Sequence, residues 1–177
     1  MRLLRDRVPK LLALLGLIVV APLPVLVNHF QIATLDPDIW WHVRVGQWIL
    51  QNHAVPHNGI FSQHAMDHAW VAYSWGFEVL TAALMRIFGL AFIPLLLGFM
   101  RALIPLVIFL VVFRVSRRFW SSWLLAVVVT LGIHLIMVAR PVLFSILFFT
   151  TEIAIIFEAR SRRSIRPLYW LPVLFWI

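Results

Sequence analysis

Long stretches of this 177-residue sequence carry almost no charge, and they limit what the chain can fold into. Every residue from 11 to 27 is apolar, glycine or proline, and the stretch 91–113 contains a single charged residue, Arg101. A helix of about 20 apolar residues spans the hydrocarbon core of a bilayer, which is about 30 Å thick. The sequence therefore predicts helices that cross a membrane.

The composition excludes several classes of protein. Hydrophobic residues make up 63% of the chain and charged residues 12%, whereas a soluble domain is about 25% charged. A soluble globular fold and a disordered chain are both excluded, since disorder requires low hydrophobicity. The absence of cysteine excludes disulfides and thiolate chemistry. The formal net charge is +8. Basic residues set the orientation of a membrane protein, which explains this excess, so no nucleic acid is expected as a partner.

We expect an all-α fold, a polytopic transmembrane helical bundle that forms one membrane domain over residues 1–177. The predicted spans are about 11–29, 91–113, 122–138, 142–157 and an incomplete span at 167–177. A cleaved signal peptide is the alternative for the first span, because a basic N-terminus precedes the apolar run. The last run of 11 residues covers about half a bilayer at 1.5 Å per residue. We therefore interpret the chain as the N-terminal fragment of a longer domain, and we expect the fragment alone to be inactive.

The basic residues predict the orientation of these spans. Of the 15 Lys and Arg residues, 11 fall in three clusters, at 2–10, 114–118 and 160–166. The predicted spans bring all three clusters to one side, and basic residues mark the cytoplasmic side. We expect a multi-pass protein of the inner (cytoplasmic) membrane, with a cytoplasmic N-terminus and an extracytoplasmic loop over about 30–90.

The predicted external loop differs in kind from the rest of the chain. Residues 28–74 hold six of the seven histidines and three of the seven acids. Structureless loops beyond about 12–15 residues are uncommon, and we expect two helices lying at the membrane interface. The first covers about 38–51, with Asp36 as its N-cap and Pro37 at its first position. The second covers about 73–88 and is closed by Gly89.

The start of the first interfacial helix carries the strongest candidate site. Asp38 and His42 are four residues apart and share a helix face, and Asp36 lies at the same end. Two carboxylates and an imidazole suit a divalent metal ion, with Asp36, Asp38 and His42 as ligands. They equally suit a carboxylate general base with a histidine partner, and the candidate catalytic residues are Asp38 and Asp36. Helix capping and first-turn charge are the alternative explanation for the acids, but they do not explain His42.

A second histidine pair, His64 and His68, has the same spacing of four residues. On a helix the two rings would share a face, as two metal ligands require. No helical periodicity surrounds them, so we interpret the segment as a solvated loop with incidental histidines.

Three arginines are candidates for binding a substrate. Arg101 lies inside a predicted span, where charges usually face an interior or a watery cavity, although pairing with Glu78 or Glu152 is an alternative. Arg140 lies at the predicted outer membrane face and could hold a phosphate, although anchoring a helix end is an alternative. Arg44 lies near the acidic cluster, on another helix face.

The run Asp38-Ile-Trp-Trp-His42-Val-Arg44 resembles the first-loop Asp-Pro-Tyr-Tyr-His-x-Arg run of oligosaccharyltransferases. With the preceding span and the long external loop, it is similar to membrane glycosyltransferases of the GT-C class. The segments Gly46–His53 and Trp75-Gly-Phe-Glu78 resemble a group of bacterial proteins that carry a GT-C-like domain.

The resemblance implies that two loop helices lie along the membrane and that a loop acid is catalytic or binds a metal. Asp38 matches that acid, with Asp36 as the alternative, and His42 accompanies it. The implied activity is transfer of a sugar from a polyprenyl-phosphate donor to an extracytoplasmic acceptor, with a divalent metal ion as the expected cofactor and membrane lipids as partners. The alternative functions are a non-enzymatic transporter or lipid-carrier-binding protein, and a structural membrane subunit.

Overall fold

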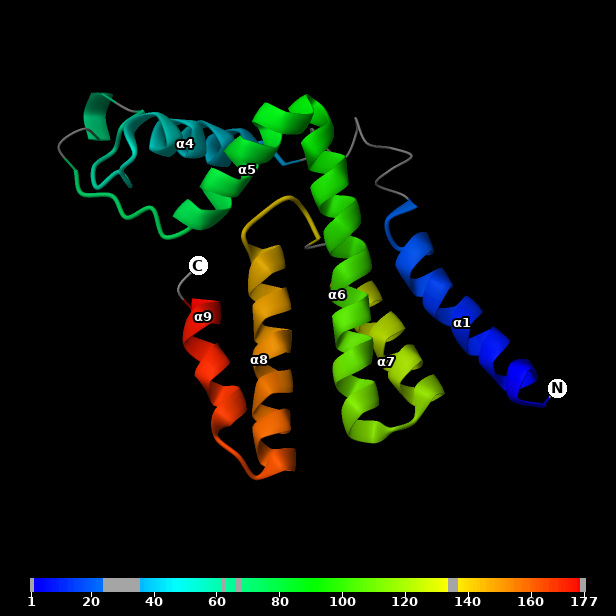
Figure 1. The fold of residues 1–177 in the computed structure, drawn as a ribbon. Helices are drawn as coiled ribbons and strands as arrows, with labels where there is room; N and C mark the ends of the chain where they lie inside the picture. The colour runs from blue at the N-terminus through cyan, green and yellow to red at the C-terminus, as the bar shows by residue number, and fades with distance from the viewer. Residues whose placement is uncertain (1, 24–35, 62, 66–67, 134–136, 176–177) are drawn as a thin grey trace. The chain divides into compact units, whose positions relative to one another are not determined.

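A computed structural model describes residues 2–23, 36–61, 63–65, 68–133 and 137–175 (Figure 1). Within these ranges the regular structure is helical, and the only β-type pairing is an isolated bridge between Asn58 and Ala69. The all-α prediction is confirmed. Backbone contacts divide the chain into two compact units. We call Met1–Ala33 with Pro94–Ile177 the large unit, and Thr34–Ile93 the hairpin unit.

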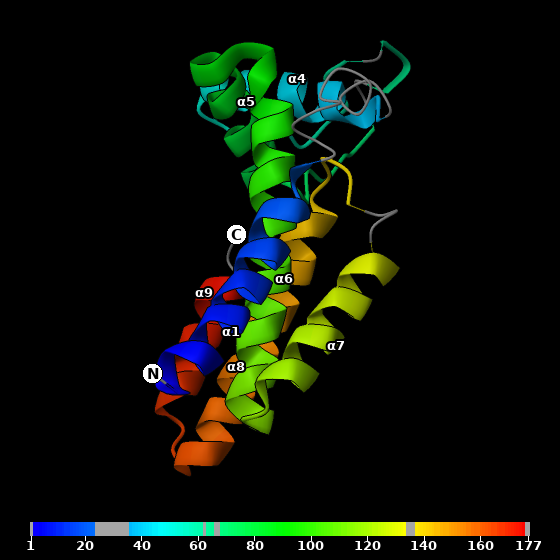
Figure 2. The same ribbon diagram turned by 90° about the vertical axis from the view of Figure 1, so that its right-hand side faces the viewer.

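The large unit is built from helices of unequal length. Its elements are α1 (Arg2–Val20), α6 (Phe92–Ser116, whose first two residues belong to the hairpin unit), α7 (Phe119–Gly132), α8 (Val142–Arg162), η4 (Arg166–Trp170) and α9 (Leu171–Phe175). The axes of α6, α7 and α8 run in the same general direction in both ribbon views (Figures 1 and 2). The indole Nε1 of Trp123 donates to the carbonyl oxygen of Ala13 at 2.9 Å, which joins α7 to α1. After the turn at η4 the chain runs back along α8, and the short α9 lies beside the first half of that helix (Figure 1).

Two helical segments, Trp75–Ser116 and Val142–Arg162, are long and apolar enough to cross a membrane. They contain the predicted spans 91–113 and 142–157. Helix α7 has 14 residues, about 21 Å at 1.5 Å per residue, and ends before the predicted span 122–138 does. Residues 134–136 of that span, and residues 24–29 of the first predicted span, lie outside the described part of the chain.

The hairpin unit consists mainly of two helices packed against each other. Its elements are α4 (Asp38–Asn52), η1 (Gln63–Ala65), α5 (Trp75–Phe88) and η2 (Gly89–Ala91). One face of α4 is apolar and buried, with Ile39, Val43 and Ile49 among its residues, as expected for an amphipathic helix. Helices α4 and α5 thus correspond to the two helices predicted at about 38–51 and 73–88.

The ends of the two hairpin helices follow from single residues. Helix α4 begins at Asp38 with Pro37 at the N-cap position, one residue later than predicted, and Pro37 has helical backbone angles, with φ −66° and ψ −20°. The Asp36 carboxylate accepts a hydrogen bond from the Asp38 amide at 3.2 Å. This bond satisfies one of the first-turn amides that have no partner within the helix. Gly89 has a φ of 59°, and its amide donates to the Met85 carbonyl oxygen. A glycine accepts this left-handed angle without steric cost, so α5 ends where the sequence predicts.

Candidate functional site

A pocket of about 210 Å³ lies in the hairpin unit. Its polar lining consists of Asp38, His42, Ser74 and Glu78. Its aromatic lining consists of Trp41, Trp70 and Tyr73. Helix α4 therefore supplies one wall, and the start of α5 with the segment before it supplies the other.

The centre of the pocket is a buried carboxylate. Glu78 is 2% exposed, and its Oε1 lies 3.3 Å from Nδ1 of His42. The Ser74 hydroxyl donates to the same oxygen at 3.0 Å. The second oxygen, Oε2, is buried and has no hydrogen-bond partner among the described residues. Because an unsatisfied buried polar atom costs free energy, this oxygen marks a position at which a ligand's donor would be favoured.

The spacing of residues along α4 explains why these groups meet. Asp38, His42 and Gly46 follow one another at intervals of four and share one face of the helix. A Cβ atom at Gly46 would lie 1.8 Å from the Glu78 carbonyl oxygen and 2.8 Å from Cβ of Ala82. Only a glycine permits this approach of backbone to backbone. The close crossing brings His42, one turn earlier, beside the Glu78 side chain.

The imidazole of His42 is held from two sides. Its ring meets Phe77 edge to face, with ring centres 5.1 Å apart, while Nδ1 faces Glu78. In the neutral tautomer that donates from Nδ1 to Glu78, Nε2 is the ring nitrogen with the lone pair. A carboxylate that orients an imidazole in this way is an arrangement suited to proton transfer.

The aromatic lining is partly open to the surroundings. Trp41 and Trp70 are arranged edge to face, with ring centres 6.1 Å apart, and Tyr73 is exposed. Flat apolar ring faces beside a few polar groups form a surface suited to a ligand that carries both apolar faces and hydroxyl groups.

The structure separates the residues predicted for α4. Asp38 and His42 both line the pocket, as their spacing predicts, and Asp38 is exposed. Asp36 is buried, and its carboxylate accepts from the Asp38 amide instead of lining the pocket. Arg44 also lies outside the pocket lining, with its guanidinium 5.8 Å from the centre of the Phe61 ring.

The other two predicted arginines belong to the large unit. Arg101 is 7% exposed, and its Nη2 donates to the Met137 carbonyl oxygen at 3.2 Å. Its Nε is buried without a hydrogen-bond partner among the described residues. Arg140 is exposed two residues before α8, and its amide donates to the Val138 carbonyl oxygen.

The predicted metal ligands do not gather with further ligands. Within the described ranges no group of three or more His, Asp or Glu side chains is placed to hold a metal ion. The Asp36 carboxylate is engaged at the start of α4. His64 lies in η1, and residues 66 and 67 of the second histidine pair's segment are outside the described part.

Sequence reasoning did not assign Glu78 to the site. It is the only acid between Asp67 and Glu152, and it falls in the first turn of α5. The helix dipole stabilises an acid at that position, so no further role was needed to explain it. The signal that could have identified it is Gly46. A glycine one turn after His42, on a buried helix face, indicates that another backbone approaches there.

Comparison with protein-family models, with curated proteins and with solved structures finds no match to this chain. The fold and the site therefore define its class. It is an all-helical protein with two segments able to cross a membrane, and its hairpin unit holds a pocket with carboxylate, imidazole and aromatic lining.

Proposed function

We propose that the chain is a glycosyltransferase-like integral membrane protein that transfers a sugar from a polyprenyl-phosphate donor to an extracytoplasmic acceptor. The observation that carries the proposal is the composition of one pocket. The exposed Asp38 lies there with the His42–Glu78 pair and three aromatic rings. The resemblance of Asp38–Arg44 to the first loop of the GT-C class supports the same activity.

Asp38 is the proposed general base. Its carboxylate accepts the proton of the acceptor hydroxyl or amide as the acceptor atom bonds to the anomeric carbon of the sugar. The bond between that carbon and the phosphate oxygen breaks, and the polyprenyl phosphate leaves with the electron pair. Arg44, in the same unit as Asp38, is the proposed phosphate-binding residue, because guanidinium groups form paired, charge-assisted hydrogen bonds with phosphate.

Glu78 has a binding and positioning role in this proposal. Its Oε2 is buried without a partner among the described residues, so a sugar hydroxyl that donated to it would remove an energetic penalty. Its Oε1 fixes the ring of His42. Trp41, Trp70 and Tyr73 would pack against the apolar faces of the sugar.

The membrane arrangement is part of the proposal. The chain would form a polytopic bundle in the inner membrane, with a cytoplasmic N-terminus and with α4 and α5 along the extracytoplasmic surface. The three basic clusters support this orientation. The chain has no cysteine, so a His57→Cys variant carries one thiol. A membrane-impermeant thiol reagent should label it in intact cells, and protection until the cells are broken would reverse the orientation.

The activity is tested with radiolabelled polyprenyl-phosphate sugars and the full-length protein in detergent or vesicles. The Asp38→Asn variant should lose transfer to the acceptor fraction. The matched control is Glu152→Gln, which makes the same carboxylate-to-amide change on α8, outside the pocket, and should transfer normally. Undiminished transfer by Asp38→Asn would remove the central assignment. The Asp36→Asn variant distinguishes the roles of the two acids. It should retain transfer, because an asparagine still accepts the hydrogen bond at the start of the helix.

The second candidate function is non-catalytic binding or transport of a lipid carrier. The burial of Arg101 within an apolar helix favours it, because charges inside membranes usually mark substrate pathways. This function predicts that Asp38→Asn is tolerated and that Arg101→Gln is not. Retention of a fluorescent polyprenyl phosphate by the purified variants distinguishes it from the enzyme.

A further inference from the structure

We infer that the large unit carries a site for the phosphate of an anionic phospholipid headgroup, at the end where α6 and α8 finish. A pocket of about 620 Å³ lies there. Its polar lining is Arg114, Glu158, Arg162, Ser164 and Arg166. The site is separate from the pocket of the hairpin unit and does not depend on the proposed glycosyl transfer.

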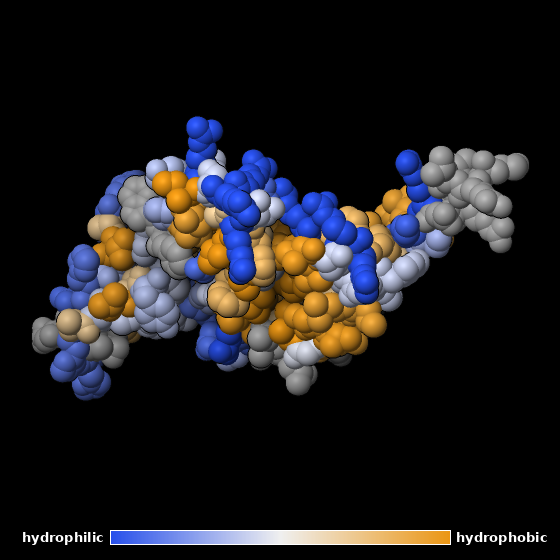
Figure 3. Space-filling view, turned by 90° about the horizontal axis from the view of Figure 1, so that it is seen from below, coloured by the Kyte–Doolittle hydropathy of each residue, from blue (hydrophilic) through white to orange (hydrophobic). Residues whose placement is uncertain are grey.

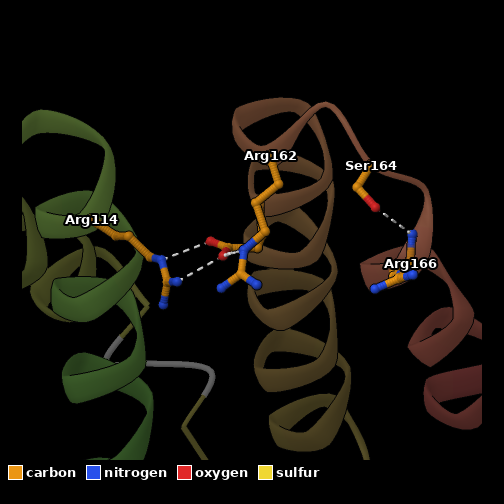
Figure 4. A network of polar contacts seen from close by, with 5 residues as sticks. Arg114, Arg162, Ser164 and Arg166 are labelled. Atoms are coloured by element: carbon orange, nitrogen blue, oxygen red, sulfur yellow. Dashed lines mark hydrogen bonds and ion pairs between the residues drawn. The ribbon is translucent and has the colours of Figure 1, made fainter.

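One carboxylate holds two of the arginines side by side. The Glu158 oxygens accept from Arg114 in a forked arrangement, with Nε 2.8 Å from Oε2 and Nη2 2.9 Å from Oε1. Nε of Arg162, one helical turn after Glu158, also donates to Oε1. Figure 4 shows both guanidinium groups converging on this carboxylate. Their positions are therefore set before any ligand arrives, which lowers the cost of ordering them on binding.

The arginines retain capacity to bind an anion. A guanidinium has five N–H donors. Glu158 occupies two donors of Arg114 and one of Arg162, and the two side chains remain 62% and 65% exposed. Three arginines and one glutamate leave the pocket lining with a net charge of +2.

The third arginine lies on the far side of the pocket. Arg166 begins η4, and its amide donates to the Ser164 hydroxyl at 3.3 Å, which fixes the turn after α8 (Figure 4). A neighbouring pocket of about 440 Å³ adds Arg117 to Arg114 and Arg162. A phosphate between these groups would receive charge-assisted hydrogen bonds from more than one chain segment.

The apolar part of the lining indicates a lipid instead of a soluble phosphate. Ile155, Pro167 and Trp170 line the same pocket, and Trp170 is exposed. Arg114 and Arg162 lie in the last turns of α6 and α8, which belong to the two segments long enough to cross a membrane. Figure 3, seen from this end, shows strongly hydrophilic side chains crossing a hydrophobic surface near the middle of the view. Tryptophan and arginine at the end of an apolar helix lie at the depth of the headgroups, where basic pockets bind anionic lipids.

The experiment is a titration of the full chain in neutral detergent, followed by native mass spectrometry. The probes are short-chain phosphatidylglycerol, short-chain phosphatidylcholine and glycerol phosphate without acyl chains. We expect one retained phosphatidylglycerol, with phosphatidylcholine and glycerol phosphate each bound at least about tenfold more weakly. Equal binding of glycerol phosphate would overturn the lipid assignment in favour of a soluble phosphate, and equal binding of phosphatidylcholine would overturn a site for an anionic headgroup.

Two double variants separate a built site from general positive charge. Arg114→Gln with Arg166→Gln removes two lining arginines. Arg160→Gln with Arg163→Gln removes the same charge from exposed positions that line neither pocket. The first pair should weaken phosphatidylglycerol binding about tenfold or more, the equivalent of one lost charge-assisted hydrogen bond, and the second pair should leave it within about twofold of the native value. An equal loss in both pairs would mean that only net charge matters and would refute the site.

Single Arg114→Gln keeps the test decisive if the first double variant does not fold. In it Arg162 still pairs with Glu158, so the local structure retains one of its two ion pairs. Circular dichroism checks that each variant has native helix content. Native phosphatidylglycerol affinity in a folded Arg114→Gln protein would also refute the proposal.

Discussion

A single methyl group at Gly46 tests the packing on which the candidate site depends. In Gly46→Ala the new Cβ would lie 1.8 Å from the Glu78 carbonyl oxygen, 2.4 Å from its carbonyl carbon and 2.8 Å from Cβ of Ala82. Two of these three atoms are backbone atoms, so no side-chain rotation relieves the overlap. Ordinary contact begins at 3.4 Å, so α4 and α5 must separate locally by the difference between 3.4 and 1.8 Å, about 1.6 Å.

The expected cost follows from two opposing effects. Overpacking a well-packed contact costs about 1–3 kcal/mol and occasionally more. Replacing glycine by alanine within a helix returns about 0.5–1 kcal/mol. Because a separation of this size exceeds a side-chain adjustment, we take the overpacking cost at the upper end of its range, about 3 kcal/mol. Subtracting the return of about 0.5–1 kcal/mol leaves an expected net loss of about 2–2.5 kcal/mol. The corresponding opening of the hairpin unit would be about 30- to 70-fold more frequent.

Hydrogen–deuterium exchange of the full chain, read by peptide mass spectrometry, measures this opening locally. Amides of α4 and α5 should exchange faster in Gly46→Ala by the factor above, while those of α8 should not change. The control is Gly16→Ala in α1, where a Cβ would meet nothing within 4 Å and exchange should be unchanged or slower. Native exchange rates in α4 and α5 of Gly46→Ala would refute the close crossing of the two helices.

Three further substitutions test other contacts by the same exchange measurement. Asp36→Ala should speed exchange in the first turn of α4, because it removes the acceptor of the Asp38 amide. The expected cost is about 0.5–2 kcal/mol. An equal effect of Asp36→Asn, which keeps an acceptor oxygen, would contradict the capping role. Glu78→Gln should lower sugar transfer but leave exchange in α5 native or slower, because a neutral amide costs less to bury than a carboxylate. Faster exchange would mean that the carboxylate stabilises the fold, which would contradict a functional role. Trp123→Phe should speed exchange in α1, because it removes the hydrogen bond to the Ala13 carbonyl oxygen, worth about 0.5–1.5 kcal/mol. An unchanged rate would show that this bond does not stabilise α1 against α7.

The parts of the fold that the sequence predicts well depend on nearest neighbours along the chain. The helices over about 38–51 and 73–88 match α4 and α5 closely, because periodicity and end signals such as Asp36 and Gly89 are local. The apolar runs likewise locate α6 and α8. They are less informative about helix length, since α8 continues to Arg162, five residues past its apolar run. Charged residues extend a helix as readily as apolar ones once it has left the apolar region.

The parts of the site that the sequence does not predict depend on contacts between distant residues. His42 and Glu78 are 36 positions apart, and neither residue alone indicates the other. Arg114 and Glu158 are separated by 44 positions. The sequence predicts only that Arg114 belongs to a basic cluster expected on the cytoplasmic side. Charge composition predicts on which side such residues lie, but it does not predict which of them share a carboxylate.

The spacing of Asp38, His42 and Gly46 joins the local and the distant information. One interval of four residues places an acid, an imidazole and a position without a side chain on the same face of α4. Gly46 lets the backbone of α5 contact α4. That contact places Glu78, in the first turn of α5, beside the imidazole of His42, which lies one turn before Gly46 on α4. An acid at that position would cost stability if it served packing alone, because one of its oxygens is buried without a partner among the described residues. Burying Glu78 does not favour stability, and Gly46 is needed only because the two helices pack so closely. The pair is therefore better explained by function than by folding.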